Sequence, residues 1–168
     1  SNNKQNERCG NKSVIGTSVC WVHLLKERKL RVKESNYGLG LYAMDGTKEN
    51  DIIFKRDQTI TKYNGDIITE NELIRRYGNY TAPYGAKMQG EDKYNDGACK
   101  RGVGTLINHG DSRYANARFS FTRAGELQIK ATKNIRNNKE ILINYNKGRR
   151  SGESKYLFNE EGVRHQTK

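Results

Sequence analysis

The sequence predicts one β-rich α+β domain, in which short strands surround a single helix. Only 33% of the 168 residues are hydrophobic, so the core is small for the length of the chain. Seventeen glycines stand against a single proline, Pro83, which is typical of many turns between short strands. One capping-box pattern in the middle of the chain predicts the helix. Together these features indicate an α+β fold.

Four short strands are expected before the helix. Residues 29–34 alternate basic and apolar side chains, which is the period of a half-buried strand. Apolar runs follow at 52–54 and 59–63. The dipeptide Asn64–Gly65 is a strong hairpin signal, and it leads to the next apolar pair, Ile67–Ile68.

The predicted helix begins after Thr69, because Thr69 and Glu72 have the spacing of a capping box. It continues through Tyr77 and ends at Gly78, since glycine readily takes the left-handed conformation of a helix C-cap. The following segment, 79–93, is polar and rich in turn residues, so we expect an irregular insert there.

Three more strands are expected after the insert. Residues 117–122 and 126–131 alternate in polarity and are joined through Ala124–Gly125. A turn at Asn137–Asn138 precedes the last strand, 141–145. Residues 1–20 lack such patterns and are expected to form a loosely ordered lead.

The chain is strongly basic, with 31 Lys and Arg, 19 Asp and Glu, and a formal net charge of +12. Five basic residues lie between Lys26 and Lys33, and three more follow the last strand, at Lys147, Arg149 and Arg150. Two interpretations are open: a solvated basic face, or contact with DNA near a substrate. No apolar run is long enough to cross a membrane, and residues 1–12 lack the apolar region of a signal peptide.

The three cysteines do not form a disulfide framework, because their number is odd and their spacings are wide. Cys9, Cys20 and His23 offer three zinc ligands, but they lack the short Cys-x₂₋₄-Cys spacing of structural zinc sites. We therefore expect free thiols in a reducing compartment, Cys99 included, and no metal site.

Residues 38–43 match the pattern G-x-G-x-x-A of dinucleotide-binding proteins. That interpretation requires a buried strand before the pattern and a helix after it. The preceding strand is half polar and the following residues form a turn, so we reject it. Two glycines still allow a backbone to approach a ligand closely. An ordinary glycine-rich turn is the alternative.

Two further segments place polar groups at the ends of apolar runs. Asn108 and His109 follow an apolar run and offer the donors and acceptors that read the edge of a purine or an amino-acid group. Tyr145 ends the run that begins at Glu140. Their order along the chain, after the Gly-x-Gly, indicates an active site.

With these segments in this order, the chain resembles the SET-domain protein lysine methyltransferases, over residues 30–146. The matching segments are 35–43 (Gly-x-Gly), Tyr63–Gly65 (Tyr-x-Gly), Asp96–Ala98 (Asp-Ala-Thr), Leu106–His109 (Phe-Ile-Asn-His) and Glu140–Tyr145 (Glu-Leu-x-Phe-x-Tyr).

The resemblance implies several small sheets, one short helix in an insert, and a pseudoknot that threads the Asn-His segment and the last strand together. It divides the chain into an N-terminal lead (1–28), a SET domain (29–146, with the insert at about 66–103) and a basic C-terminal tail (147–168). The family's cofactor is S-adenosylmethionine. It binds on one face, and the substrate lysine enters a narrow channel from the other.

The resemblance also assigns roles to individual residues. Asn108 and His109 would hold the adenine and amino-acid ends of the cofactor, and the Gly-x-Gly would contact it through backbone. The residues expected to bind the cofactor are Gly38, Leu39, Gly40, Tyr84, Asn108 and His109.

The catalytic residues implied are Tyr145 and Tyr63, and the lysine channel is lined by Tyr63, Phe119 and Tyr145. Lysine has a reference pKa of ~10.4, so an apolar channel helps to deprotonate it. With a reference pKa of ~10, Tyr145 orients the amine rather than acting as its base. Plain core packing is the alternative interpretation for Tyr63 and Phe119.

The sequence departs from the family pattern in several places. The segment after His109 lacks the usual Pro and Cys, and residues 147–168 contain no cysteine, so no zinc-binding clusters are expected. Tyr156 and Phe158 close the cofactor site or pack on the core. Ile143 replaces the Phe or Tyr that many members carry there, so the number of methyl groups transferred is left open.

The activity implied is S-adenosylmethionine-dependent methylation of a protein lysine, which we expect to lie in a histone tail. A non-histone basic protein is the alternative substrate, and a non-catalytic chromatin-binding module is the alternative function. The expected partners are the substrate protein and nucleosomal DNA, with no membrane. The expected location is the nucleus, or a host nucleus if the source is a virus or an intracellular microbe.

Overall fold

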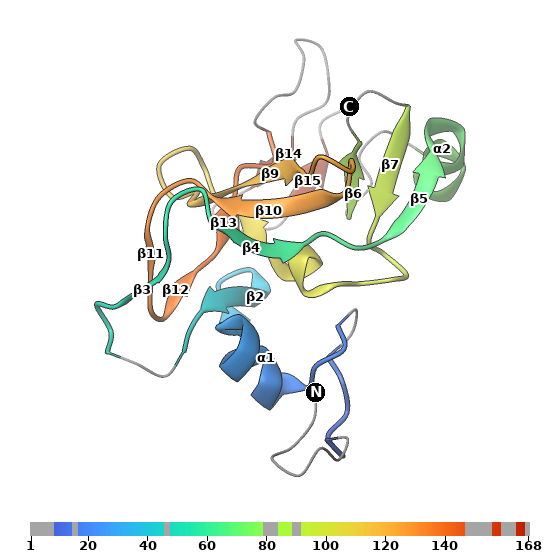
Figure 1. The fold of residues 1–168 in the computed structure, drawn as a ribbon. Coiled ribbons are helices and arrows are strands. Elements are labelled where there is room, and N and C mark those ends of the chain that lie inside the picture. The colour runs from blue at the N-terminus through green and yellow to red at the C-terminus, as the bar shows by residue number, and fades with distance from the viewer. Residues whose placement is uncertain are drawn as a thin grey trace.

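The computed structural model describes residues 9–14, 17–45, 48–78, 84–88 and 92–146, and the backbone alone of 156–158 and 164–166. The elements in these residues are α1 (Trp21–Arg28), β1 (Leu30–Ser35), β2 (Gly38–Ala43), β3 (Ile52–Phe54), β4 (Thr59–Lys62), β5 (Asp66–Thr69), α2 (Glu70–Tyr77), β6 (Gly85–Lys87), β7 (Lys93–Asp96), the 3₁₀-helix η1 (Val103–Leu106), β8 (Asn108–His109), β9 (Ala117–Phe121), β10 (Leu127–Ala131), β11 (Ile135–Arg136), β12 (Lys139–Glu140), β13 (Leu142–Ile143), β14 (Tyr156–Phe158) and β15 (Arg164–Gln166) (Figure 1).

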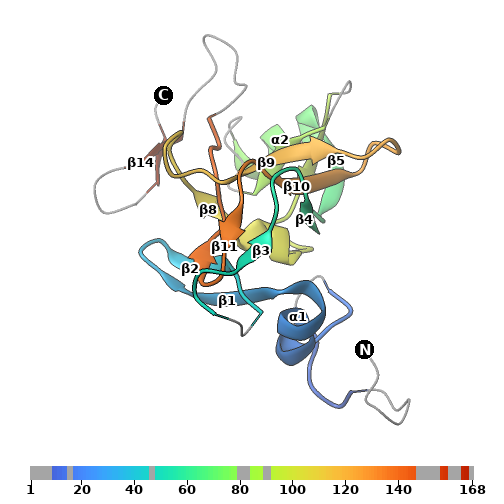
Figure 2. The ribbon, with the colours of Figure 1, turned by 60° about the vertical axis from the view of Figure 1, so that its left-hand side comes forward.

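The largest sheet has five strands in the order β4-β10-β9-β13-β8. Strand β10 is antiparallel to both β4 and β9, whereas β13 runs parallel to β8 and β9. Strand β13 therefore lies between β8 and β9 in the sheet. These two strands, labelled in Figure 2, are consecutive in the chain. This order agrees with the predicted pseudoknot, in which the last strand of the domain enters the loop between β8 and β9.

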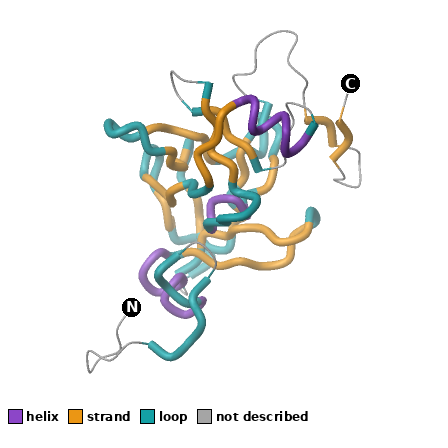
Figure 3. The backbone as a smooth tube through the Cα atoms, turned by 90° about the vertical axis from the view of Figure 1, so that its right-hand side faces the viewer, coloured by secondary structure: helices purple, strands orange, loops and turns teal. Residues whose placement is uncertain are grey.

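Smaller sheets surround the large one. They have the orders β1-β2-β12, β11-β3, β14-β15 and β5-β7-β6. Helix α2 lies beside the β5-β7-β6 sheet, and α1 lies at the opposite end of the molecule, near the N-terminus (Figures 1 and 3). The predicted β-rich α+β fold of several small sheets is confirmed.

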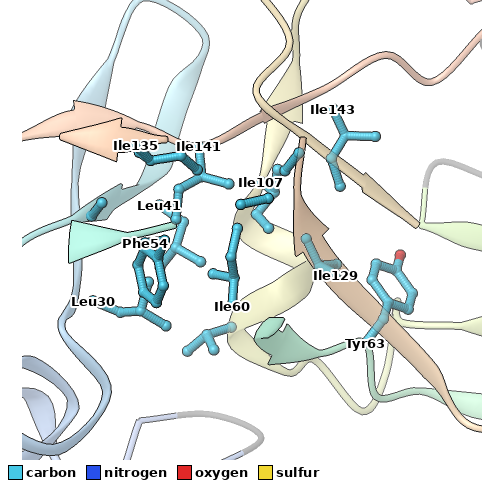
Figure 4. Packing of buried hydrophobic residues seen from close by; sticks show 14 of the residues in the cluster. Leu30, Leu41, Phe54, Ile60, Tyr63, Ile107, Ile129, Ile135, Ile141 and Ile143 are labelled. Atoms are coloured by element: carbon cyan, nitrogen blue, oxygen red, sulfur yellow. The ribbon is translucent and has the colours of Figure 1, made fainter. Parts of the chain in front are cut away.

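One aliphatic core joins the large sheet to the sheet of β1, β2 and β12 (Figure 4). Leu30 and Leu41 come from the small sheet and Ile129 from the large one, and each is at most 1% exposed. Burying one such side chain contributes roughly 1.5–3 kcal/mol. In Figure 4, Tyr63 lies at the edge of this core beside Ile129, and its hydroxyl points away from the aliphatic side chains.

Helix α2 forms as the capping box predicts. The Thr69 side chain accepts a hydrogen bond from the backbone N–H of Glu72, and Gly78 takes the left-handed conformation at φ +68°. No helix among the described residues is long and apolar enough to cross a membrane.

The prediction of a β-hairpin at Asn64–Gly65 is wrong. Strand β4 pairs with β10, and β5 pairs with β7, so this dipeptide connects two sheets instead of closing one. A Cβ atom on Gly65 would lie 2.3 Å from the backbone oxygen of Asp96. The glycine is therefore needed because two backbones pass close together, and not for a turn.

Two other expectations differ from the structure. Helix α1 occupies the end of the N-terminal lead, where none was predicted. Its N-cap, Cys20, makes no side-chain capping bond, and Leu24 is its one buried residue, so the sequence carries little helical signal. The strand predicted at 141–145 is shorter: β13 spans Leu142–Ile143, and the Ile141 N–H instead bonds the Leu41 carbonyl, beside the β12–β2 pairing.

A buried carboxylate attaches α2 to its sheet. Asp96 is 0% exposed and accepts bonds from Arg76 Nη1 at 3.0 Å, the Tyr77 hydroxyl at 2.8 Å and the Ala98 N–H at 3.0 Å. Burial, followed by the bond to Asp96, raises the pKa of Tyr77 to about 12. Without Asp96, the Tyr77 hydroxyl would lose its acceptor and Arg76 would keep only its bond to Glu72.

Replacing Asp96 by alanine is expected to lower the free energy of unfolding by about 3 kcal/mol, because the Tyr77 hydroxyl loses its acceptor and Arg76 loses its buried ion pair. Urea denaturation measures this loss. Arg75→Ala is the matched control: the Arg75 side chain is 76% exposed and pairs with Glu72, so the loss should stay below about 0.5 kcal/mol. Equal losses in the two variants would contradict the assigned role of Asp96.

Candidate active site

The main chain at the start of β2 is exposed. Gly38 faces Ser35 across the β1–β2 hairpin and has φ +93°, a conformation that side chains other than glycine rarely adopt. A Cβ atom on Gly38 would meet nothing within 4 Å, and Leu39 is 56% exposed. The main chain of Gly38 and Leu39 is therefore accessible to a ligand.

Gly40, in contrast, faces the interior of the site. A Cβ atom there would lie 2.3 Å from Glu140 Oε1 and 3.1 Å from Asn108 Nδ2. The first distance is shorter than real Cβ contacts allow, so any side chain at this position would displace the Glu140 carboxylate. Glycine at this position leaves the Glu140 carboxylate and the Asn108 amide in place where three elements meet.

The amide of Asn108 joins those elements. Its Nδ2 lies 2.8 Å from Glu140 Oε1, 3.0 Å from Ser35 Oγ and 3.3 Å from the Leu39 carbonyl, and its two N–H groups serve these three acceptors. The structure thus brings the predicted cofactor residues Gly38–Gly40 and Asn108 to one place, at the junction of β2, β8 and β12.

Glu140 is a site residue to which the sequence analysis gave no role. Besides Asn108, it approaches the Tyr42 hydroxyl at 3.5 Å. Burial and then the negative charge of Glu140 raise the pKa of Tyr42 above its usual value, so the phenol stays protonated. Its place in the Glu140–Tyr145 motif was visible in the sequence, but its partners come from distant strands.

His109 and Tyr145 are held together by the parallel pairing of β8 and β13, in which Ile143 lies opposite His109. The backbone N–H of Tyr145 donates to His109 Nδ1 at 3.1 Å, and the two rings meet edge to face at 5.4 Å. Because Nδ1 accepts, a neutral His109 carries its proton on Nε2.

The Tyr145 hydroxyl points back toward the segment that precedes β8. It donates a hydrogen bond to the backbone carbonyl of Ile107, the residue before Asn108. The phenol proton is therefore engaged by backbone, and the lone pairs of the oxygen remain its acceptor sites.

Tyr63 and Phe119 form the second aromatic pair. Their rings meet edge to face at 5.4 Å. Tyr63 is 7% exposed and donates from its hydroxyl to the Tyr84 carbonyl at 2.6 Å. Tyr63 belongs to the buried core, whereas Phe119 is half-buried and packs against it.

Tyr84 lies with this pair. Its carbonyl accepts from the Tyr63 hydroxyl and from the Gly97 N–H, and the Arg101 guanidinium lies 4.4 Å from the centre of its ring. These contacts place Tyr84 beside Tyr63. A contact between Tyr84 and the cofactor stays a prediction.

A cavity of about 480 Å³ opens beside the aromatic pair. Phe119 and Ile143 form part of its wall, and Asn144, which precedes Tyr145, forms another part. The described residues that line it are Ala117, Arg118, Phe119, Ile143 and Asn144. Its volume is typical of small-ligand pockets. Phe119 therefore connects the buried Tyr63 with an accessible space, as a channel wall would.

A match to the SET domain family covers residues 38–146, which is more than half of the chain. The chain belongs to the SET domain family. No curated protein sequence matches this SET domain.

Solved structures share the fold. One is ctPRC2 in an autoinhibited conformation bound to S-adenosylmethionine, with a TM-score of 0.56 and 20% identity, covering 70% of this chain and 15% of that one. Another is a humanized mutant of the Chaetomium thermophilum Polycomb Repressive Complex 2 bound to the inhibitor GSK126, with a TM-score of 0.56 and 21% identity, covering 69% and 14%. This SET domain thus spans about 15% of the length of these chains.

Asn116 is a second residue to which the sequence analysis gave no role. It is 8% exposed, donates to the Glu140 carbonyl at 2.7 Å and accepts from the Leu142 N–H at 2.9 Å. It therefore fixes the segment that carries Glu140 and leads to Tyr145. The contact is invisible in the sequence, because a polar residue before a strand is ordinarily a turn signal.

Proposed function

We propose that this SET domain is an S-adenosylmethionine-dependent protein-lysine N-methyltransferase. The observation that carries the proposal is that three family motifs meet where β8 pairs with β13. Gly38–Gly40 lies against Asn108, and His109 lies against Tyr145. A module that only binds chromatin has no need of this arrangement.

The residues around Gly40 fit S-adenosylmethionine in two respects. The open main chain of Gly38 and Leu39 allows close approach of a ligand. Asn108 and the Nε2–H of His109 supply side-chain hydrogen-bonding groups beside it. Gly38, Leu39, Gly40, Asn108 and His109 would hold the cofactor, which when bound supplies an electrophilic methyl group.

The two catalytic tyrosines are suited to orienting an amine. The hydroxyl protons of Tyr63 and Tyr145 both go to backbone carbonyls, of Tyr84 and Ile107. Each phenol oxygen therefore accepts, and does not donate, toward a third group. Such oxygens bind the N–H groups of a lysine amine and leave its lone pair aimed at the methyl group.

The aromatic surroundings also favour the reactive form of lysine. A protonated amine, with a reference pKa of ~10.4, has no lone pair to donate. Tyr63 and Phe119 are apolar walls that disfavour the ammonium, so the proton leaves to solvent before transfer. Alignment of the neutral amine then supplies much of the remaining acceleration.

The substrate we propose is a histone tail presented on a nucleosome. The net charge of +12 repels a free basic protein and attracts DNA. Nucleosomal DNA would counter that repulsion while the tail enters the cavity beside Phe119. The same reasoning favours a location in the nucleus, or in a host nucleus. A non-histone basic protein is the alternative substrate.

Replacing Tyr145 by phenylalanine is expected to slow methyl transfer on the order of 100-fold, because the orienting oxygen is lost. The S-adenosylmethionine affinity should stay within about threefold, because the groups proposed to hold the cofactor remain in place. Labelled S-adenosylmethionine with core histones, nucleosomes and ribosomal proteins measures transfer, and calorimetry measures affinity. Tyr114→Phe is the control, since Tyr114 is 63% exposed. Unchanged transfer in Tyr145→Phe would remove Tyr145 from catalysis.

Replacing Gly40 by alanine is expected to weaken S-adenosylmethionine binding at least tenfold, about 1.4 kcal/mol, because the new methyl group displaces Glu140 and with it Asn108. Calorimetric titration measures the affinity. Gly10→Ala is the matched control, because a Cβ atom there meets nothing within 4 Å. Wild-type protein with no measurable affinity would favour the non-catalytic module.

The substrate is tested by comparing nucleosomes with free core histones over a range of salt. Nucleosomes are expected to be labelled faster at low salt, and the advantage should shrink as salt rises, because DNA contacts are screened. Faster labelling of free histones at every salt concentration would contradict the DNA contact. Label on ribosomal proteins alone would support the non-histone substrate.

A further inference from the structure

Three side chains of the N-terminal lead meet at one point, at the start of α1. The ligand atoms of Cys9, Cys20 and His23 all lie within 4.8 Å of one another. We propose that these three residues bind one Zn²⁺ ion. From the sequence alone we expected free thiols and no metal, because the wide spacing of Cys9 and Cys20 hides how close their side chains lie.

The distances match a zinc centre. Cys9 Sγ lies 3.9 Å from Cys20 Sγ, and Cys20 Sγ lies 3.1 Å from His23 Nδ1. Tetrahedral zinc, with bonds of roughly 2.3 Å to sulfur and 2.0 Å to nitrogen, places two sulfurs about 3.8 Å apart and sulfur and nitrogen about 3.5 Å apart. Small side-chain adjustments therefore bring all three atoms into the first coordination sphere.

The local fold explains how a wide spacing gives a compact site. Ser13 and Cys20 form an antiparallel bridge, and the Val14 N–H donates to the Val19 carbonyl at 2.8 Å. The Thr17 hydroxyl contacts the backbone carbonyls of both Val14 and Val19. The chain therefore turns back on itself and returns Cys20 to Cys9, so a short Cys-x₂₋₄-Cys spacing is not needed.

Helix α1 supplies the third ligand. Cys20 is its N-cap and His23 lies in its first turn, so both side chains project from the same end of the helix. The positive end of the helix dipole favours a thiolate at this position. Zinc binding would release the protons of the two thiols to solvent and leave one tetrahedral position for water or a further donor.

The site would fix the lead to the domain. Val14 and Val19 are each 4% exposed and Leu24 is 0% exposed, and all three belong to the main core. Among the described residues of the lead, 9–14 and 17–28, regular structure is limited to one bridge and an eight-residue helix. A structural metal commonly supplies the missing stability in such short segments.

A Cys9–Cys20 disulfide is the competing explanation. The two sulfurs are 3.9 Å apart, whereas a disulfide bond is about 2.05 Å long. A disulfide also leaves unexplained why His23 Nδ1 points at the Cys20 sulfur. The third cysteine, Cys99, is exposed and makes no part of the cluster, so it serves as an internal reference.

The test combines metal content with thiol reactivity, on the full chain purified with zinc present. We expect about one zinc per chain, one thiol (Cys99) reactive toward a colorimetric reagent, and three reactive thiols after a strong chelator. Cobalt substitution should give the visible absorption of a tetrahedral thiolate site. The variants Cys20→Ser and His23→Ala should lose the metal, whereas Cys99→Ser should keep it.

Two results would overturn the proposal. Three reactive thiols in the zinc-treated wild-type protein would mean that no metal protects Cys9 and Cys20. One reactive thiol that a chelator leaves unchanged and a reductant raises to three would establish the disulfide instead. Both readouts use the wild-type chain, so they hold even where a variant fails to fold.

Discussion

The site depends on the position of β13 between β8 and β9. The Gly110 N–H donates to the Ile143 carbonyl and the Asn116 N–H to the Leu142 carbonyl, both at 3.0 Å, so the loop between β8 and β9 encloses the last strand. Gly110 is needed there, because a Cβ atom would lie 2.8 Å from the Leu142 side chain. This crossing sets Asn108 and His109 on one side of β13 and the cavity beside Phe119 on the other. In the proposed function, the cofactor side and the substrate side both follow from this one strand arrangement.

Backbone groups do much of the positioning at this crossing. Carbonyls orient the phenols of Tyr63 and Tyr145, and a backbone N–H sets the tautomer of His109. Backbone groups are held by the sheets themselves, so they stay in place without the reorganisation that mobile side chains require. The charged group beside Asn108, Glu140, acts by holding the Asn108 amide. This arrangement suits methyl transfer, in which alignment of the amine matters more than acid–base exchange at the site.

Local patterns in the sequence predicted local structure well. The capping box gave α2, and alternating residues gave the β9–β10 pair. The assignments that were wrong or missing depend on contacts between distant segments. Asn64–Gly65 is a hairpin signal, yet β5 pairs with β7 and not with β4. Asn116 and Glu140 hold the site through partners that no spacing rule connects to them. The family resemblance identified Asn108, His109 and Tyr145 as candidate site residues. The proximity of Cys9 to Cys20 and His23 could be seen only in the structure. The predicted roles of Tyr156 and Phe158 and of the basic tail fall outside the side chains that the structure describes.

The most direct test of the central claim is a crystal structure of the chain with S-adenosylmethionine. The account predicts that the cofactor contacts the backbone of Gly38–Gly40 and the side chains of Asn108 and His109, with the Tyr145 hydroxyl beside its methyl group. It also predicts that the methyl group points toward the cavity that Phe119 lines. A cofactor bound elsewhere, or one whose methyl group is separated from Tyr145 by the strands of the large sheet, would contradict the proposed active site.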